Sequence, residues 1–341
     1  MFYFKRPSSK RPKGLKDCTM KSVAQMIIHG KLKNIAFLTG AGISVAAGIP
    51  DFRSPGGMYD TLRPELLTAT KKQREKMATN PTAVVSWDLF KENQFPYMEL
   101  RRPFILGDKG KWKPTLAHFF IKICEEKKLL KRIFTQNIDG LDYHLGVADE
   151  KIIPVHGSLG RASCEFCGAL YPIDELRKQI KTKIKDIYCT DKDAPKESEN
   201  ILCLKCNKPG IKPSTVLYGR NLPEAFFEAK EQDLHEVDLL IVMGTSLTVG
   251  PANLVPLEVN NDCVRMVINR EPVGEELGID YGENADRDVF GKGDCDSIVL
   301  ELVNELGWLD DLMKYVNDMA PKSAALLNPS QKLQSEKKRK G

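Results

Sequence analysis

A glycine turn directly after a short apolar run is the first feature of the sequence that could do chemistry. Residues 35–38 are apolar, as in a buried parallel strand, and Gly40 and Gly42 follow them. Glycines let the backbone turn tightly and approach a ligand, because they carry no Cβ. If the small residues 44–47 begin a helix, its N-terminus and the turn together suit a dinucleotide diphosphate. The alternative is that the glycines only join a strand to a helix, since Val45 replaces the third glycine of the usual fingerprint.

Charged residues follow this turn sooner than expected. An acid, an aromatic ring and a guanidinium occur within residues 49–54, directly after a proline. A dinucleotide enzyme that transfers hydride would instead continue its helix and next strand, and would place an acid about 20 residues further on. The early break in the chain therefore predicts charged groups beside the bound dinucleotide.

Two further apolar runs end in residues that suit catalysis. Residues 131–134 are followed by a polar segment from Thr135 to Asp142, and residues 152–155 are followed by His156. The carboxyl ends of parallel strands are where open α/β sheets bind ligands. A histidine at such an end suits a general base, because its unperturbed pKa is about 6.5. Taken alone, the polar segment could be a capped turn and the histidine could be structural.

Four cysteines have the spacing of metal ligands. Cys164 and Cys167 form one Cys-x-x-Cys pair, and Cys203 and Cys206 form another. Four thiolates satisfy the tetrahedral coordination of Zn²⁺ and leave no open position for water, so the predicted ion is structural. Cys189 lies in the long, polar gap between the pairs and has no partner at ligand spacing, so we do not expect it to bind the ion.

Together these motifs resemble those of the sirtuins, the NAD-dependent protein deacylases, over roughly residues 18–310. Residues 40–54 read Gly-Ala-Gly-Ile-Ser-x-x-x-Gly-Ile-Pro-Asp-Phe-Arg-Ser, the first signature of that family. Thr-Gln-Asn-Ile-Asp at residues 135–139 and His-Gly at residues 156–157 are the second and third matches. Three later segments that match the adenosine-side contacts follow in the family order: residues 244–247, 269–271 and 293–296.

The resemblance implies a reaction that consumes NAD⁺. In that family the acyl oxygen of an acylated lysine attacks a ribose carbon as nicotinamide leaves. His156 would then deprotonate a ribose hydroxyl, and deacylated lysine and O-acyl-ADP-ribose would follow. Asn137 and Asp139, the other two implied catalytic residues, would hold the nicotinamide ribose and carboxamide, with Ile49 and Asp51 near the amide. The implied NAD⁺ contacts are Gly40, Ala41, Gly42, Ser44, Ile49, Asp51, Phe52, Arg53, Tyr59, Gln136, Asn137, Ile138, Asp139, Gly244, Thr245, Ser246, Asn269, Arg270, Glu271 and Cys295.

The segment over residues 212–220 resembles the part of a sirtuin that holds the acyl-lysine substrate. It departs from the family pattern, which commonly has Asp at Ser214, Phe at Leu217 and at Tyr218, and Glu at Arg220. We expect the cationic Arg220 to favour acidic residues that flank the substrate lysine. The implied substrate contacts are Val216, Leu217, Tyr218 and Gly219.

The acyl preference is predicted from a missing pair. Sirtuins that prefer negatively charged acyl chains share a Tyr-x-x-Arg pair on the helical module, whereas here Tyr97 is followed at that spacing by Leu100. An acyl carboxylate would then be desolvated without a partner, which is costly. We therefore expect acetyl and longer apolar chains to be preferred over acidic ones.

These motifs require a sheet whose strands all end at one edge. We expect an α/β fold, a Rossmann-like doubly wound parallel sheet with an inserted small zinc-binding module and a helical module. The catalytic domain should span residues 18–315, with the helical insertion at about 55–110 and the zinc module at about 157–212. Residues 1–17 should form a basic, flexible arm and residues 316–341 a polar, basic tail. The expected helices are 17–30, 114–128 and 298–306, and the expected strands are 35–38, 131–134, 152–155, 238–243 and 264–268.

The composition excludes several other classes. The chain has 341 residues, of which 42% are hydrophobic and 28% are charged, as in globular proteins, and its net charge is +5. It has no apolar run of about 18 residues and no signal-peptide core, so we expect neither a membrane span nor secretion. The modest net charge gives no ground for sequence-specific nucleic-acid binding. The nine cysteines fit an intracellular metal site better than a disulfide framework.

The expected partners are acylated-lysine proteins or peptides, with histones and tubulin as examples, in the nucleus or the cytoplasm. The cofactors are NAD⁺ as co-substrate and one structural Zn²⁺. Two alternatives remain open at this point. A mono-ADP-ribosyltransferase would use the same NAD⁺ site with a protein nucleophile, and a non-enzymatic scaffold would bind NAD⁺ and zinc without turnover.

Overall fold

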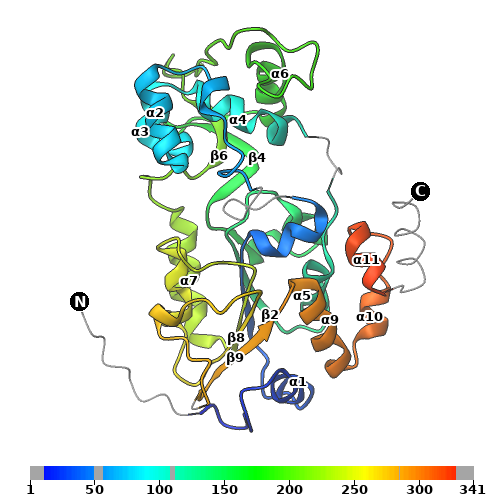
Figure 1. Ribbon diagram of the computed structural model, residues 1–341. Coiled ribbons are helices and arrows are strands. Elements are labelled where there is room, and N and C mark those ends of the chain that lie inside the picture. Colours follow the sequence, from blue (N-terminus) through cyan, green and yellow to red (C-terminus); the bar gives the residue numbers. More distant parts are fainter. Residues whose placement is uncertain (1–10, 50–56, 108–111, 284, 328–341) are drawn as a thin grey trace.

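Six parallel strands form the main sheet of the computed structural model, which describes residues 11–49, 57–107, 112–283 and 285–327 (Figure 1). The strand order is β3-β2-β1-β7-β8-β9, and each neighbouring pair is parallel. The strands are β1 (Ile35–Thr39), β2 (Leu130–Thr135), β3 (Ile152–Pro154), β7 (Leu239–Met243), β8 (Val264–Asn269) and β9 (Asp288–Lys292).

The strand order places a topological switch between β1 and β7. From β1 the chain proceeds outward through β2 to β3, and from β7 it proceeds outward through β8 to β9 on the other side. In doubly wound sheets, ligands bind in the crevice beyond the carboxyl ends of the strands at this switch. The predicted Rossmann-like arrangement is therefore confirmed, and the expected strands all occur.

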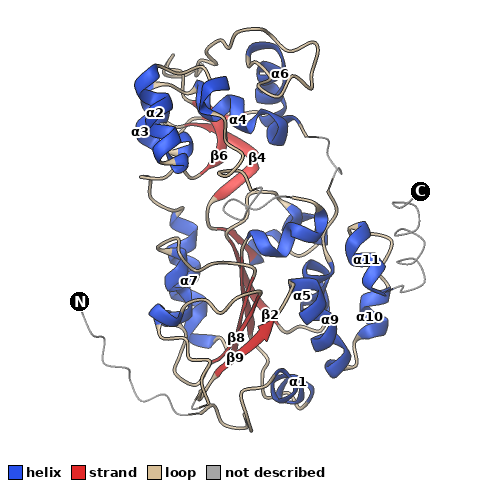
Figure 2. Cartoon of the chain, in the orientation of Figure 1, coloured by secondary structure: helices blue, strands red, loops and turns tan. Residues whose placement is uncertain are grey.

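Helices cover both faces of the sheet (Figure 2). The central strands are buried throughout, and alternate side chains enter opposite cores: Phe37 faces one core and Leu38 the other. The helices that share a core with Phe37 are α1 (Met20–Ile28), α5 (Leu116–Glu126), α9 (Cys295–Leu306) and α10 (Leu309–Met313). Those that share a core with Leu38 are α7 (Glu224–Asp233) and α8 (Val255–Glu258).

A smaller domain stands beyond the carboxyl ends of the strands. Its helices surround a three-stranded antiparallel sheet of order β5-β4-β6. Leu67 and Phe90 of the helical insertion share one apolar core with Leu176 and Ile211 of the zinc-binding part, so the two predicted modules pack as one unit. Its elements are α2 (Lys71–Thr79), α3 (Trp87–Glu92), α4 (Phe95–Leu106), β4 (Gly157–Cys164), β5 (Leu170–Tyr171), α6 (Ile173–Lys183) and β6 (Ile211–Thr215).

Short helices join these elements, and one more follows them near the C-terminus. In the described ranges, no helix combines the length and the apolar content needed to cross a membrane. The 3-10 helices are η1 (Ala41–Ala47), η2 (Pro64–Leu66), η3 (Pro81–Val85), η4 (Leu141–Leu145), η5 (Asp149–Lys151), η6 (Leu234–Glu236), η7 (Ala252–Leu254) and η8 (Glu275–Leu277). The last α-helix is α11 (Pro321–Leu327).

Both predicted ends of the catalytic domain differ from the structure. Residues 11–17, expected in the flexible arm, pack on the body: Leu15 is buried, and Arg11 donates a hydrogen bond to the carbonyl of Ala285. Residues 316–327, expected in the polar tail, include the buried Met319 and Ala320. Scattered apolar residues in a polar context gave no periodic signal, but Leu15 and Met319 join the same apolar core as α5 and α9. Residues 1–10 and 328–341 lie outside the described part of the chain.

The turns after β1 and β7 approach so closely that only glycine fits. The backbone N–H of Gly42 donates to the carbonyl of Gly244 at 2.8 Å. A Cβ on Gly244 would lie 2.5 Å from the backbone nitrogen of Ile43, and the φ of Gly244 is +62°. Two backbones without side chains between them thus form the floor of the switch-point crevice.

We predict that Gly244→Ala destabilises the fold more than Gly278→Ala. Gly278 also has a positive φ, +78°, but a Cβ there would meet nothing within 4 Å. In both variants the left-handed conformation lowers the free energy of unfolding by about 1–2 kcal/mol. Overpacking in Gly244→Ala lowers it by about a further 1–3 kcal/mol. Urea unfolding of both variants measures the difference, and equal losses would show that the close approach does not constrain the fold.

Candidate functional site

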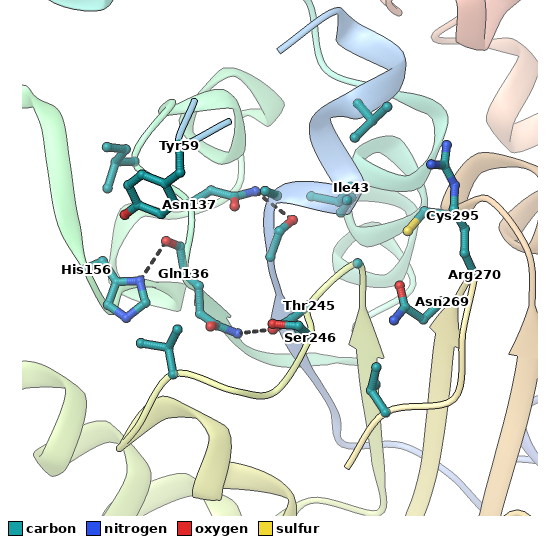
Figure 3. Close-up of a pocket in the computed structure, with 18 of the residues that line it drawn as sticks. Ile43, Tyr59, Gln136, Asn137, His156, Thr245, Ser246, Asn269, Arg270 and Cys295 are labelled. Carbon is teal, nitrogen blue, oxygen red and sulfur yellow. Dashed lines mark hydrogen bonds between the residues drawn. The ribbon is translucent and has the colours of Figure 1, made fainter. Parts of the chain in front are cut away.

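A cavity of about 790 Å³ lies at the switch point, between the sheet and the small domain. The sheet contributes the turns after all six strands, from which the labelled residues of Figure 3 other than Tyr59 come. The small domain contributes residues of α4 and residues 215–220 at the end of β6. Most of the residues predicted to bind NAD⁺ or to act in catalysis meet here. They are Gly40, Ala41, Gly42, Tyr59, Gln136, Asn137, Ile138, His156, Gly244, Thr245, Ser246, Asn269, Arg270, Glu271 and Cys295.

A second cavity of about 500 Å³ adjoins the first and shares Asn137 and Ile138 with it. It is lined by the three remaining predicted contacts that the structure describes, Ser44, Ile49 and Asp139. Asp51, Phe52 and Arg53 lie outside the described residues. Every predicted NAD⁺ contact that the structure describes therefore lines one of two neighbouring cavities.

The glycine turn lines the main cavity and packs closely on the turn after β7. Gly40 donates to the carbonyl of Met243 at 3.0 Å, and a Cβ on Gly40 would lie 2.7 Å from the carbonyl oxygen of Gly244. The segment after the turn is the 3-10 helix η1 and not the longer helix expected from its small residues. It ends at Gly48, which has a φ of +88°, two positions before the proline in the sequence. Residues 44–47 therefore end a short helix and do not begin one, contrary to the expectation.

A hydrogen-bond network ties the turn after β1 to the turn after β2. The buried amide of Asn137 donates from Nδ2 to the carbonyl of Gly40 at 3.0 Å and to Oγ of Ser44 at 3.3 Å. Ser44 in turn donates to Oδ2 of Asp139 at 2.7 Å. The side chains predicted to hold the nicotinamide ribose and carboxamide are thus fixed before any ligand arrives.

Two acids, Asp139 and Asp142, follow β2. Burial raises the pKa of Asp139, although the N–H of Leu141 and the hydroxyl of Ser44 oppose this. Burial and the charge of Asp139 raise the pKa of Asp142 to about 7, against a smaller opposing effect of a hydrogen bond from Thr135. Asp142 is 2% exposed, so its carboxyl group keeps its proton at pH values well above the ordinary pKa of an aspartate.

His156 is oriented by the same strand ends. Its Nδ1 lies 3.0 Å from the carbonyl oxygen of Gln136, whose Nε2 donates to Oγ1 of Thr245 at 2.9 Å (Figure 3). Since a carbonyl only accepts, the Nδ1 of a neutral ring carries the proton and Nε2 carries the lone pair. The geometry therefore gives His156 the tautomer of a general base acting through Nε2.

The predicted substrate segment lies between the two domains and lines the main cavity. Val216 donates its N–H to the carbonyl of His156 at 2.8 Å, which ties the segment to the base. Tyr218 exchanges backbone hydrogen bonds with the loop at the start of α3: Trp87 donates to Tyr218 at 2.9 Å, and Tyr218 donates to Val85 at 3.0 Å. All four predicted residues, Val216, Leu217, Tyr218 and Gly219, line the cavity.

The four paired cysteines converge in the small domain. The Sγ atoms of Cys164 and Cys206 are 3.6 Å apart, those of Cys167 and Cys203 are 3.7 Å apart, and all four lie within 4.8 Å of one another. A zinc–sulfur distance of about 2.3 Å gives a tetrahedron with edges of about 3.8 Å, so the set fits a four-thiolate Zn²⁺ ion. Cys189 is exposed and does not belong to this cluster.

Comparison with known proteins agrees with this geometry. A sequence model of the Sir2 family matches residues 40–251. The chain belongs to the Sir2 family. It is similar to the NAD-dependent protein deacetylase hst2 of Schizosaccharomyces pombe, with 39% identity over 301 residues that cover 87% of this chain and 79% of the relative. It is also similar to the NAD-dependent protein deacetylase sirtuin-2 of Danio rerio, with 36% identity over 318 residues that cover 89% of this chain and 76% of the relative. The resemblance to the sirtuins is confirmed.

Arg101 is a charged cavity residue of this Sir2-family chain that the sequence analysis did not identify. Arg101, on α4, is 6% exposed and lines both cavities, and its guanidinium lies 6.0 Å from the ring centre of Phe104. The acyl preference was predicted from the missing Tyr-x-x-Arg pair and did not take this cation into account, so the preference stays a prediction. Two consecutive arginines within the predicted helical insertion were the signal that could have found it.

Arg220 has partners that the sequence did not indicate. Its Nε lies 3.2 Å from Oε1 of Glu165, and its guanidinium lies 4.8 Å from the ring centre of Trp87. The side chain is 45% exposed at the cavity rim. Because Glu165 already offsets its charge, Arg220 should act on acidic flanking residues more weakly than a lone cation would, and that effect stays a prediction.

The zinc assignment predicts one equivalent of tightly held zinc per chain. Cys203→Ser should lose the metal and unfold at a lower temperature, since metal binding supplies folding free energy. Cys189→Ser is the matched control and should keep both the zinc and the stability. Metal analysis and thermal unfolding measure the two effects. Normal zinc in Cys203→Ser together with zinc loss in Cys189→Ser would overturn the ligand set.

The buried Asp142 predicts a pH-dependent stability. Its pKa is about 7 in the folded chain but about 3.9 in an unfolded one, so the folded state alone keeps the proton between these values. The free energy of unfolding should therefore fall as the pH rises from about 4 to 7. Asp142→Asn removes this term, so its stability relative to the wild type should rise over that range, as measured by urea unfolding at several pH values. The exposed Asp193→Asn should show no such trend, and identical trends in both variants would contradict the account.

Proposed function

We propose that this chain is an NAD-dependent protein-lysine deacetylase, which moves the acyl group of an acylated lysine to ADP-ribose and releases nicotinamide. One observation carries the proposal: the base His156, the amide of Asn137, the glycine turn and the substrate segment all line a single cavity. The names of the relatives, NAD-dependent protein deacetylases, support the same reaction class.

Two groups of residues would hold the dinucleotide. NAD⁺, when bound, supplies the ribose carbon that accepts the acyl oxygen and the hydroxyl that receives the acyl group. The backbone of Gly40 and Gly42 lines the cavity where its diphosphate would bind, and these residues add no side chain there. Asn137, Ser44 and Asp139 form the preorganised end where nicotinamide and its ribose would bind.

His156 performs the proton transfer in this proposal. Its Nε2 accepts the proton of a ribose hydroxyl, and the ring becomes a cation. The carbonyl of Gln136 accepts from Nδ1–H at 3.0 Å and stabilises that cation. Gln136 is itself held by Thr245 at 2.9 Å, so the base keeps its orientation through the reaction.

The zinc cluster acts at a distance by supporting the substrate segment. Cys164 ends β4 and pairs in the small sheet with Ile211, the first residue of β6. β6 leads directly into Val216, whose N–H binds the carbonyl of His156. Four thiolates leave no open coordination position, so zinc takes no part in the chemistry.

The alternatives receive less support. A protein ADP-ribosyltransferase needs no base for a ribose hydroxyl, yet His156 has the tautomer of one. A scaffold without turnover needs neither that base nor the adjoining substrate segment. The proposed substrates are acylated proteins, and we place histones and tubulin first among them, in the nucleus or the cytoplasm.

His156→Ala should lower the rate of lysine deacylation by about 10²–10⁴-fold, the usual contribution of a general base. NAD⁺ should still bind, because the base acts only after docking. Turnover of acetylated histone and tubulin peptides measures the first effect, and calorimetric titration with NAD⁺ measures the second. His118→Ala is a matched control that tests a buried histidine outside the cavity, on α5. Loss of NAD⁺ binding in step with activity for His156→Ala would make His156 a structural residue.

A further inference from the structure

The C-terminal helix α11 forms part of the cavity wall. Lys322 and Leu326 of this helix line the same cavity as the glycine turn and Cys295. α11 packs against η1, the segment that follows the turn, and Figure 1 shows it beside α9 and α10. This helix lies outside the residues matched by the family and outside every motif of the sequence analysis.

Buried hydrogen bonds hold α11 in place. Ser323 donates from Oγ to Oδ2 of Asp296 at 2.5 Å, and both residues are buried. Ala320 donates its backbone N–H to the carbonyl of Pro114 at 2.8 Å. Because its neighbour Ser323 is anchored in this way, the backbone of Lys322 is fixed at the rim of the cavity.

The charges around the cavity distinguish Lys322 from the other cations. Arg220 pairs with Glu165, and Arg270 pairs with Asp294 at 2.5 Å. Arg101 is buried on the side of the small domain. Within the part of the chain that the structure describes, Lys322 makes no ion pair with a carboxylate.

The phosphate end of a dinucleotide needs such a cation. Residues 40–47, which adjoin α11, contain no charged side chain, so the turn itself offers only backbone dipoles. Glu271, Asp294 and Asp296 line the same cavity, and Arg270 pairs with Asp294, so two carboxylates remain that would repel phosphates. Without Lys322 the local charge is therefore unfavourable for a diphosphate.

We propose that Lys322 is an NAD⁺-binding residue that neutralises the diphosphate, and that α11 belongs to the cofactor site. The inference rests on the proposed function, since it takes the cavity as the NAD⁺ site. The inference adds a contact from residues 316–341, which were expected to form a polar, basic tail. The ammonium group of Lys322 binds the phosphates as a point charge, and Leu326 provides an apolar wall beside that group.

Calorimetric titration with ADP-ribose tests whether Lys322 binds the diphosphate, and it requires no acyl transfer. Lys322→Ala should weaken binding about 5- to 10-fold, and Lys322→Glu should weaken it further. Lys322→Arg keeps the charge and should bind nearly as well as the wild type. The loss should shrink at high salt, because an exposed charge is screened. Lys21→Glu, on the distant α1, makes the same charge change and should leave the affinity unaltered.

The outcomes distinguish a failure of the Lys322 inference from a failure of the proposed function. Losses confined to the Ala and Glu variants at position 322, with unchanged thermal unfolding, would support the inference. Equal affinity in the wild type and Lys322→Glu would overturn it while leaving the NAD⁺ site intact. A wild-type chain that binds no ADP-ribose would overturn the proposed function along with it. In steady-state assays the KM for NAD⁺ should rise in Lys322→Glu while the KM for the peptide stays unchanged, and the opposite pattern would also contradict the inference.

Discussion

The close contact between the turns after β1 and β7 is the constraint on which the site depends. Gly42 and Gly244 meet backbone to backbone, with 2.8 Å between the amide nitrogen of one and the carbonyl oxygen of the other. Side chains are excluded from this floor, so functional groups can stand only around it. Asn137 uses this arrangement directly, because its amide binds the carbonyl of Gly40 on the same turn. The position of the catalytic groups is therefore set by backbone that carries no functional side chain of its own.

A second link joins the chemistry to the small domain. His156 lies in the short connection between β3 and β4. Gly157, the first residue of β4, has a φ of +77° and turns the chain into that strand. The carbonyl of His156 then accepts from Val216, and the buried Lys212 fixes the end of β6 by donating to the carbonyl of Thr215 at 2.5 Å. The base and the substrate segment thus share one hydrogen-bonded unit. Loss of zinc, far from the reacting atoms, should disturb both at once.

Local features of the sequence predicted most of the fold and most of the site. The strand ends, the Cys-x-x-Cys pairs and His156 each carry their signal within a few residues, and the structure brings them together. The features that sequence analysis missed depend on packing between distant segments. Arg101 and Lys322 reach the cavity from helices whose orientation no local pattern gives. The helix expected to begin at residues 44–47 is instead the 3-10 segment Ala41–Ala47, which Gly48 ends.

The product of the reaction tests the central claim most directly. The chain is incubated with NAD⁺ and an acetyl-lysine peptide, and all products are identified by mass spectrometry. If His156 activates a ribose hydroxyl for acyl transfer, then nicotinamide, deacetylated peptide and O-acetyl-ADP-ribose should appear in equal amounts. Release of nicotinamide with a peptide that keeps its acetyl group and gains ADP-ribose would contradict the account, because no acyl group would then have moved to the ribose hydroxyl that His156 activates.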